Sequence, residues 1–188
     1  MKNKSQLLIA FFLLGLAMPQ IAKAQSDDEI AEQTINVSLG QVALLAIPPV
    51  EVNLSLASAS FAGEAVATAL SNENSRLRIT SLVGEGVTRQ VEAQITTGTL
   101  PFGTMLQIEA LPAIANFIGD GGESSGAQIL STTSTAVVLN TIGSCNSGVL
   151  DGDGYQLKYT FSEDTDPETS AVAGAADITI TYTLVEEI

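Results

Sequence analysis

The chain has 188 residues and is strongly acidic, with 21 Asp and Glu against seven Lys and Arg and a net charge of −14 at pH 7. Such a surface repels phosphate backbones, and neither a GxGxxG nor a P-loop spacing occurs, so nucleic-acid and nucleotide binding are disfavoured. Histidine is absent, which excludes Ser-His-Asp and Cys-His catalysis and removes the usual nitrogen ligand of zinc sites.

The N-terminus has the pattern of an export signal. Two lysines precede the apolar run Leu7–Met18, and a small-x-small sequence, Ala22-Lys23-Ala24, stands before Gln25. The run is shorter than the ~20 residues that cross a membrane, and Pro19 follows it. We therefore expect a signal peptide at 1–24 and an exported mature chain without a transmembrane span, located in the periplasm, at the cell surface or outside the cell. An uncleaved N-terminal anchor is the alternative.

The mature chain is expected to be one acidic domain. Removing the signal leaves four basic residues against 21 acidic ones, four minus 21 or −17; the four are Arg76, Arg78, Arg89 and Lys158. Residues 25–33 predict a mobile acidic leader, and residues 34–188 are long enough for one β-rich domain with its own core. The single cysteine, Cys145, has no internal disulfide partner, so it is either a buried free thiol or a thiol that pairs with another chain.

The first strands are predicted from alternation of apolar and polar residues. Ile35–Leu39 and Val52–Leu56 alternate with a period of two, which is typical of half-buried strands. Val42–Ile47 is apolar in both phases and predicts a strand buried on both faces. Pro48-Pro49 is expected to end that strand because proline has no backbone N–H to donate.

The middle of the chain predicts further strands. Leu77–Val83 and Val91–Ile95 alternate around Gly84-Glu85-Gly86, which predicts a hairpin. Three more strands are expected, at Thr104–Ala110, Ala127–Ser131 and Thr135–Ile142. Gly63–Leu70 is compatible with a helix, a strand or a loop, and long polar loops are expected at Gly119–Gly126 and Ser162–Ala176.

The clearest strands are the last two, Tyr155–Phe161 and Ile178–Leu184. In the final strand the apolar side chains face inward and the threonines face outward; the inward set is Ile178, Ile180, Tyr182 and Leu184. About nine strands separated by polar loops predict an all-β, two-sheet sandwich in a single domain.

A calcium site is the one metal possibility. Hard carboxylate ligands two residues apart can hold calcium, and the candidates are Asp151, Asp153, Asp164 and Asp166. The EF-hand pattern fails, because Tyr155 stands at its fifth position and Ser162 at its twelfth. The alternative is a tight Asp-Gly turn that leads into a strand.

Catalysis is not expected. A pair of carboxylates can cleave glycosidic bonds, but sugar-binding clefts display aromatic platforms, and the mature chain has seven Phe and Tyr and no Trp. Lys158, the sole lysine of the mature chain, lies on the polar phase of its strand and is expected to be solvated. We therefore predict no enzyme, no catalytic residue and no cofactor.

The C-terminal part resembles the last two strands of bacterial pilin-like and cell-surface immunoglobulin-like sandwiches. The resemblance is carried by Gly154–Thr160 and Ala176–Leu184, about the last thirty-five residues. It implies an extracellular structural or adhesive role with no catalytic residues to carry over, although the paired cysteines of many fimbrial subunits are absent. Ile35–Leu39 is either a strand donated to a neighbouring subunit or a strand that closes its own sandwich.

Two functional predictions follow. The first is a secreted, non-catalytic surface or fimbria-like structural or interaction protein, which meets a protein partner or assembles with itself. The alternative is an extracellular binding module for calcium or a carbohydrate.

Overall fold

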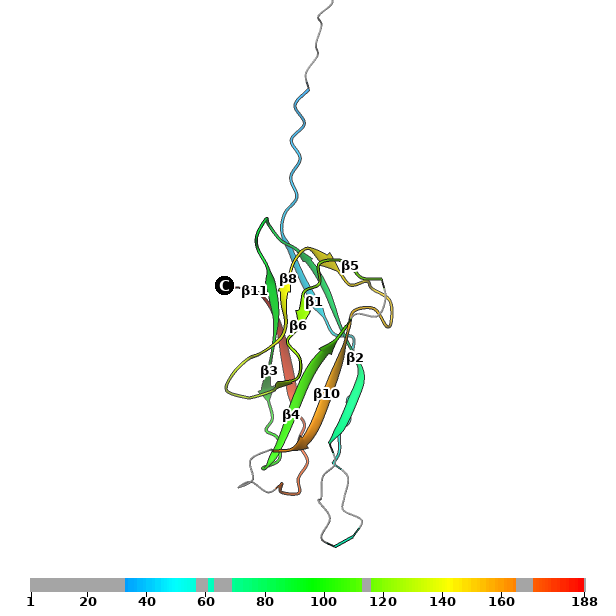
Figure 1. Ribbon diagram of the computed structural model, residues 1–188, viewed down its shortest axis with the longest axis vertical. Coiled ribbons are helices and arrows are strands. Elements are labelled where there is room, and N and C mark those ends of the chain that lie inside the picture. Colours follow the sequence, from blue (N-terminus) through cyan, green and yellow to red (C-terminus); the bar gives the residue numbers. More distant parts are fainter. Residues whose placement is uncertain (1–32, 57–60, 63–68, 113–115, 165–170, 188) are drawn as a thin grey trace, which may run out of the picture. The chain divides into compact units, whose positions relative to one another are not determined.

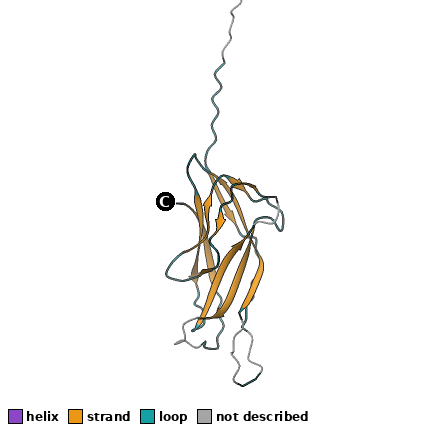
Figure 2. Ribbon diagram, viewed as in Figure 1, coloured by secondary structure: helices purple, strands orange, loops and turns teal. Residues whose placement is uncertain are grey.

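The computed structural model describes residues 33–56, 61–62, 69–112, 116–164 and 171–187, and within these ranges all regular structure is β (Figures 1 and 2). The chain divides into two units, residues 1–38 and residues 39–188, and all the strands belong to the second unit. No helix in the described ranges has the length and apolar character needed to cross a membrane.

The strands of the second unit form two antiparallel sheets that pack together, which confirms the predicted all-β, two-sheet architecture at this level. One sheet has the order β5-β9-β2-β10-β4-β7, and β1 pairs with β2 outside this path. Its strands are β1 Val42–Ala46, β2 Leu70–Leu82, β4 Thr104–Leu111, β5 Ile118–Gly119, β7 Gln128–Ile129, β9 Cys145–Asn146 and β10 Tyr155–Glu163. The second has the order β11-β3-β8-β6 and contains β3 Arg89–Thr97, β6 Glu123–Ser124, β8 Ala136–Ile142 and β11 Thr179–Glu186.

The core follows the period-two pattern of the sequence. Alternate residues of β2, β3 and β10 are buried, and the residues between them are more exposed. The fully buried large apolar side chains are Leu77, Ile79, Val91, Ile108, Val138, Leu139, Ile142 and Leu157. Burying a side chain of this size contributes roughly 1.5–3 kcal/mol, so these residues are the main source of stability.

The predicted hairpin around Gly84–Gly86 is wrong. β2 and β3 belong to different sheets, so the turn carries the chain from one sheet to the other. The turn itself is present, because the Val87 amide donates to the Gly84 carbonyl at 3.2 Å. A period of two identifies a strand and its buried face, but it does not identify the strand's partner.

The early strands are only partly as predicted. Residues 33–41 contain no strand, and Val52–Leu56 forms no ladder although its alternation of exposure persists. Val42–Ile47 does contain β1, but most of its side chains are exposed, because β1 pairs with β2 alone and the expected burial on both faces is wrong.

The remaining predictions fare differently. β4, β8, β10 and β11 match predicted strands closely, whereas the strand predicted at Ala127–Ser131 shortens to β7 and the loop predicted at Gly119–Gly126 contains β6. Most of the ambiguous segment Gly63–Leu70 lies outside the described residues. Cys145 is a buried free thiol on β9, and burial raises the pKa of this thiol.

Candidate binding groove

The first side of the groove is a segment that leaves the sheet after β1. Pro48 and Pro49 follow β1, and proline cannot donate a ladder hydrogen bond. The chain from Val50 to Leu56 then runs without a strand partner. Its apolar side chains Val52 and Leu54 still pack against the core, so this segment covers the interior with side chains while its backbone pairs with no described strand.

The opposite side is formed by the residues before β11 and by the first half of that strand. β11 is hydrogen-bonded to β3 and to no other described strand. At its far end Glu186 is in register with Arg89, and the buried Arg89 guanidinium donates to the Val42 carbonyl of β1. β1 thus approaches β11 near Glu186, and the end near Thr179 faces the groove.

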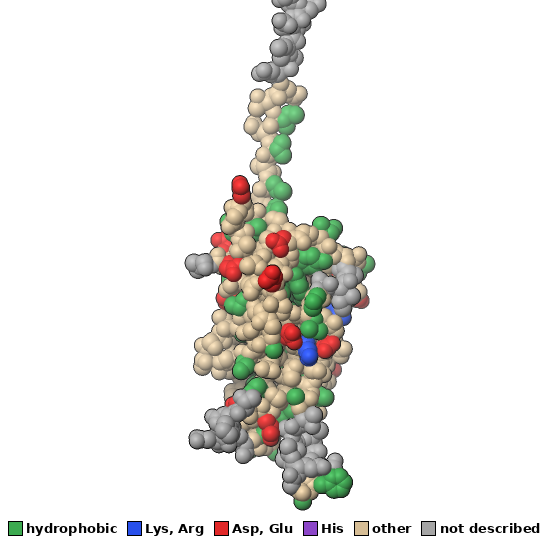
Figure 3. Space-filling model, viewed as in Figure 1, with side chains coloured by type: hydrophobic (Ala, Val, Ile, Leu, Met, Phe, Trp, Pro, Cys, Tyr) green, Lys and Arg blue, Asp and Glu red, His purple; other side chains and the backbone are tan. Residues whose placement is uncertain are grey.

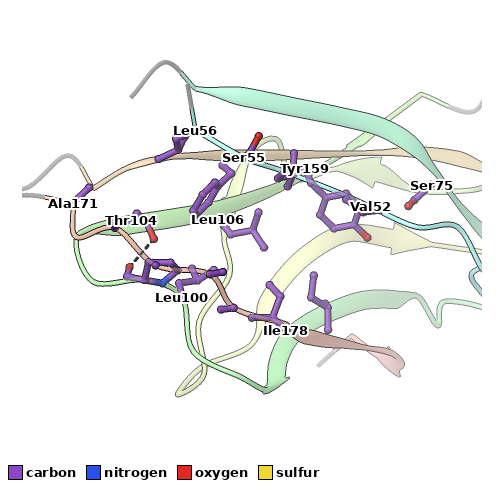
Figure 4. Close-up of a pocket in the computed structure, with 18 of the residues that line it drawn as sticks. Val52, Ser55, Leu56, Ser75, Leu100, Thr104, Leu106, Tyr159, Ala171 and Ile178 are labelled. Atoms are coloured by element: carbon purple, nitrogen blue, oxygen red, sulfur yellow. Dashed lines mark hydrogen bonds between the residues drawn. The ribbon is translucent and has the colours of Figure 1, made fainter. Parts of the chain in front are cut away.

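Between these two sides the structure contains a largely apolar cavity of about 850 Å³ (Figure 4). β4 and β10 contribute Leu106, Tyr159 and Phe161, and Ser75 comes from β2. The other lining residues are Ile47, Val50, Val52, Leu54, Ser55, Leu56, Leu100, Pro101, Thr104, residues 171–176, Ile178, Ile180 and Tyr182. No lining residue in the described ranges carries a charge, so the groove suits an uncharged apolar group.

The loop before β4 and the segment before β11 are hydrogen-bonded to each other at one end of the groove. The Val172 amide donates to the Phe102 carbonyl at 3.0 Å, and Thr104 Oγ1 donates to the Pro101 carbonyl at 2.6 Å. Gly98 has a positive φ of 84°, and a Cβ atom at this position would collide with the Asp177 carbonyl oxygen. Glycine therefore allows the end of β3 to approach the residues that enter β11.

A cluster of hydroxyl groups lies in this largely apolar groove. Tyr159 of β10 and Tyr182 of β11 belong to different sheets, and their hydroxyl oxygens are 2.5 Å apart. Ser75 of β2 also lines the groove. Burial raises the pKa of both phenols, and the contacts from Tyr182 and Ser75 oppose this rise at Tyr159. Both tyrosines are therefore neutral near pH 7.

The charged side chains lie outside the groove, and acidic groups are spread over the face drawn in Figure 3. Arg76, Arg78 and Lys158 occupy the outward-facing positions of β2 and β10. Arg78 forms an ion pair with Asp151 at 3.2 Å. This arrangement separates the apolar groove from the acidic exterior.

The four calcium candidates are not brought into one group. Asp153 is buried and accepts from Asn116 Nδ2 at 2.9 Å and from the Leu150 amide at 2.7 Å, whereas Asp151 is exposed beside Arg78. Asp164 lies beyond the other end of β10, where its amide donates to the Gly103 carbonyl, and Asp166 lies outside the described residues. No cluster of three or more metal-ligating side chains occurs in the ranges that the structure describes.

Sequence reasoning did not find the groove. Its two sides come from Val50–Leu56 and from residues 171–182, which are more than a hundred residues apart in the chain. The available signal was local: Pro48-Pro49 follows the end of β1, and the alternating apolar segment Val52–Leu56 comes soon after. That combination indicates a segment that packs without pairing.

Neither a protein-family model nor a curated protein sequence matches this chain.

Proposed function

We propose that this chain is a secreted, non-catalytic surface protein of fimbria-like character that works by binding an extended strand of another molecule, and that the other molecule is a second copy of the chain. The observation that carries the proposal is the largely apolar groove beside the edge of β11 that pairs with no described strand. Strand addition of this kind uses main-chain hydrogen bonds for affinity and side-chain pockets for specificity.

The edge of β11 has little of the usual protection against strand pairing, and its one register irregularity lies at its start, between Thr179 and Ile180. Edge strands are commonly shortened, charged, bulged or interrupted by proline. β5, β6 and β7 are edge strands of two residues each, whereas β11 has eight residues. From Thr179 to Val185 it contains neither a charge nor a proline. The part of this edge that faces the groove, away from β1, favours the addition of a partner strand.

The segment Thr34–Leu39 has the chemistry that the groove requires. It is uncharged, and Ile35, Val37 and Leu39 recur with a period of two. These three side chains are 72%, 88% and 83% exposed, and the segment forms no strand. Apolar side chains this exposed, in a regular alternating row, are typical of an interaction surface.

The spacing of the apolar side chains in Thr34–Leu39 also matches the spacing of the residues that line the groove on β11. Residues two apart in a strand are roughly 6.6–6.8 Å apart and lie on the same face. Ile178, Ile180 and Tyr182 line the groove with this spacing, and Thr179 and Thr181 face away from it. A strand that pairs with β11 and carries three apolar residues in phase is able to fill the groove and leave its polar residues outside.

Light scattering after size exclusion, over a range of concentrations, tests the proposal. We expect the chain from Gln25 to Ile188 to assemble as its concentration rises, because each copy offers both a strand and a groove. Val37→Asp should abolish assembly, since it would bury a charge in an apolar groove. Asn36→Asp, which adds the same charge on the polar phase, is the matched control and should retain assembly.

Assembly that is unaffected by Val37→Asp would contradict the proposal, as would a chain that stays monomeric at every concentration. Running each sample with calcium and with a chelator distinguishes strand addition between copies from the alternative, a calcium-binding module. Strand addition predicts the same assembly in both conditions.

A further inference from the structure

The hydroxyl cluster in the groove has an unusual position for polar groups. Tyr159 and Ser75 are 5% and 3% exposed, and the side chains that surround them in the groove are largely apolar. Two sheets can pack face to face without hydroxyl groups between them, and apolar side chains at these positions would fill the same space. We therefore looked for a specific role of these hydroxyl groups in the groove.

The cluster contains more hydrogen-bond donors than it can use within itself. Tyr159, Tyr182 and Ser75 carry one O–H each, which makes three donors. One hydrogen bond is formed among them, between the Tyr159 and Tyr182 hydroxyls, and Ser75 lines the groove with them. No other hydrogen bond joins these hydroxyls to a described residue, so at least one O–H remains to be donated elsewhere. A buried donor without an acceptor costs about 1–3 kcal/mol.

An added strand supplies the missing acceptor. A strand that pairs with β11 along one edge presents the carbonyl groups of alternate residues along its other edge, where no ladder partner is present. Those carbonyls need donors inside the groove, because an apolar groove excludes water that would otherwise satisfy them. The hydroxyl cluster is the set of uncharged side-chain donors that bridges β10 and β11 there.

We infer that the Ser75–Tyr159–Tyr182 cluster is a specificity-determining contact, which donates a hydrogen bond to a main-chain carbonyl of the strand bound in the groove. This inference rests on the proposed function. It adds that the groove selects a peptide backbone at a fixed register, and does not merely take up apolar side chains.

Phenylalanine substitutions isolate the hydroxyl groups. Tyr159→Phe and Tyr182→Phe remove one oxygen atom each and keep the ring. Tyr155→Phe is the matched control: its hydroxyl is also buried and donates to the Gly121 carbonyl at 2.8 Å, but Tyr155 does not line the groove. All three variants should keep the far-ultraviolet spectrum of the parent chain.

The test is calorimetric titration of a peptide with the sequence of residues 33–41 into the chain that carries Val37→Asp, whose own strand is disabled. We expect Tyr159→Phe and Tyr182→Phe to weaken peptide binding by roughly 3- to 10-fold, the loss of one neutral hydrogen bond. Tyr155→Phe should leave the affinity unchanged. Equal peptide affinity in all variants would overturn the inference and leave the strand-binding proposal intact. No peptide binding by the Val37→Asp chain with all its tyrosines in place would overturn both.

Ester bonds in the peptide distinguish a direct contact from a structural effect. Replacing one amide with an ester weakens one carbonyl acceptor at a time. We expect one ester position to weaken binding to the parent chain and to have little further effect on Tyr159→Phe, because both changes remove the same hydrogen bond. Ester effects that simply add to the effect of Tyr159→Phe at every position would overturn the inference.

Discussion

Tyr159 and Tyr182 are hydrogen-bonded to each other from opposite sheets, with their hydroxyl oxygens 2.5 Å apart. Both tyrosines line the groove, and Tyr182 stands on β11, which pairs with β3 along its whole length. The pair joins the two sheets at the point where a partner strand is proposed to enter.

The tyrosines should resist ionisation in the folded chain. Burial raises the pKa of Tyr155 to about 12 and also raises those of Tyr159 and Tyr182, whereas an unfolded phenol ionises near ~10. The stability that depends on neutral phenols is therefore fully present below pH ~10 and is lost as the pH rises above it. We expect phenolate absorbance to appear together with unfolding in an alkaline titration, and not before it. Phenolate that forms at pH ~10 while the fold is intact would contradict the burial of these rings.

The faces of β11 can be tested by a pair of aspartates. Ile180 is partly buried against the core, and Thr181 is exposed on the other face. Ile180→Asp places an unpaired charge against apolar side chains and should cost about 3 kcal/mol or more, while Thr181→Asp should cost about 1 kcal/mol or less. Chemical denaturation of both variants measures the difference. Equal costs would show that the faces of β11 are assigned wrongly.

Arg89 should hold β1 on the sandwich. Its guanidinium is buried and donates to the Val42 and Leu82 carbonyls, to Ser81 Oγ at 3.1 Å and to Gln41 Oε1 at 3.3 Å. Arg89→Met leaves these acceptors without a donor and should cost about 1–3 kcal/mol. Hydrogen exchange should then accelerate in β1 more than in β10.

Lys158→Met is the control for Arg89→Met, because Lys158 lies on the outward face of β10. It removes the same charge and should change the free energy of unfolding by about 0.5 kcal/mol or less. Similar losses in the two variants would show that Arg89 acts through net charge and not through its contacts with β1.

Asp153 should make the fold acid-sensitive. Hydrogen bonds from Asn116 and from the Leu150 amide hold the pKa of this carboxyl below its usual value. Its contribution to stability is therefore present above the ordinary carboxyl pKa and is lost as the pH falls through the lowered folded-state value. Asp153→Asn should melt at a lower temperature than the parent chain at neutral pH, and the difference should shrink in acid. A difference in melting temperature that stays the same from neutral to acidic pH would contradict the role of the Asp153 charge.

The sequence predicted the sheets better than their connections. Alternating Thr and apolar residues identified the inward face of β11, and the pattern around Leu77 and Ile79 identified that of β2, because a period of two is a property of one strand. The assignment of β2 and β3 to different sheets depends on contacts between distant strands, which no local pattern contains. The same holds for the groove, whose two sides are far apart in the chain. At Asp153 the turn interpretation describes the observed contacts, since the carboxylate binds the amide of Leu150 within its own loop.

The most direct test of strand exchange between copies is a mixing experiment with two disabled variants. Val37→Asp retains the groove and loses the strand, whereas Leu100→Glu places a charge in the groove lining and retains the strand. Each variant alone should elute as a monomer, and an equimolar mixture should form a one-to-one complex, because the mixture contains one working strand and one working groove. A mixture of correctly folded variants that stays monomeric, or assembly by either variant alone, would contradict the account.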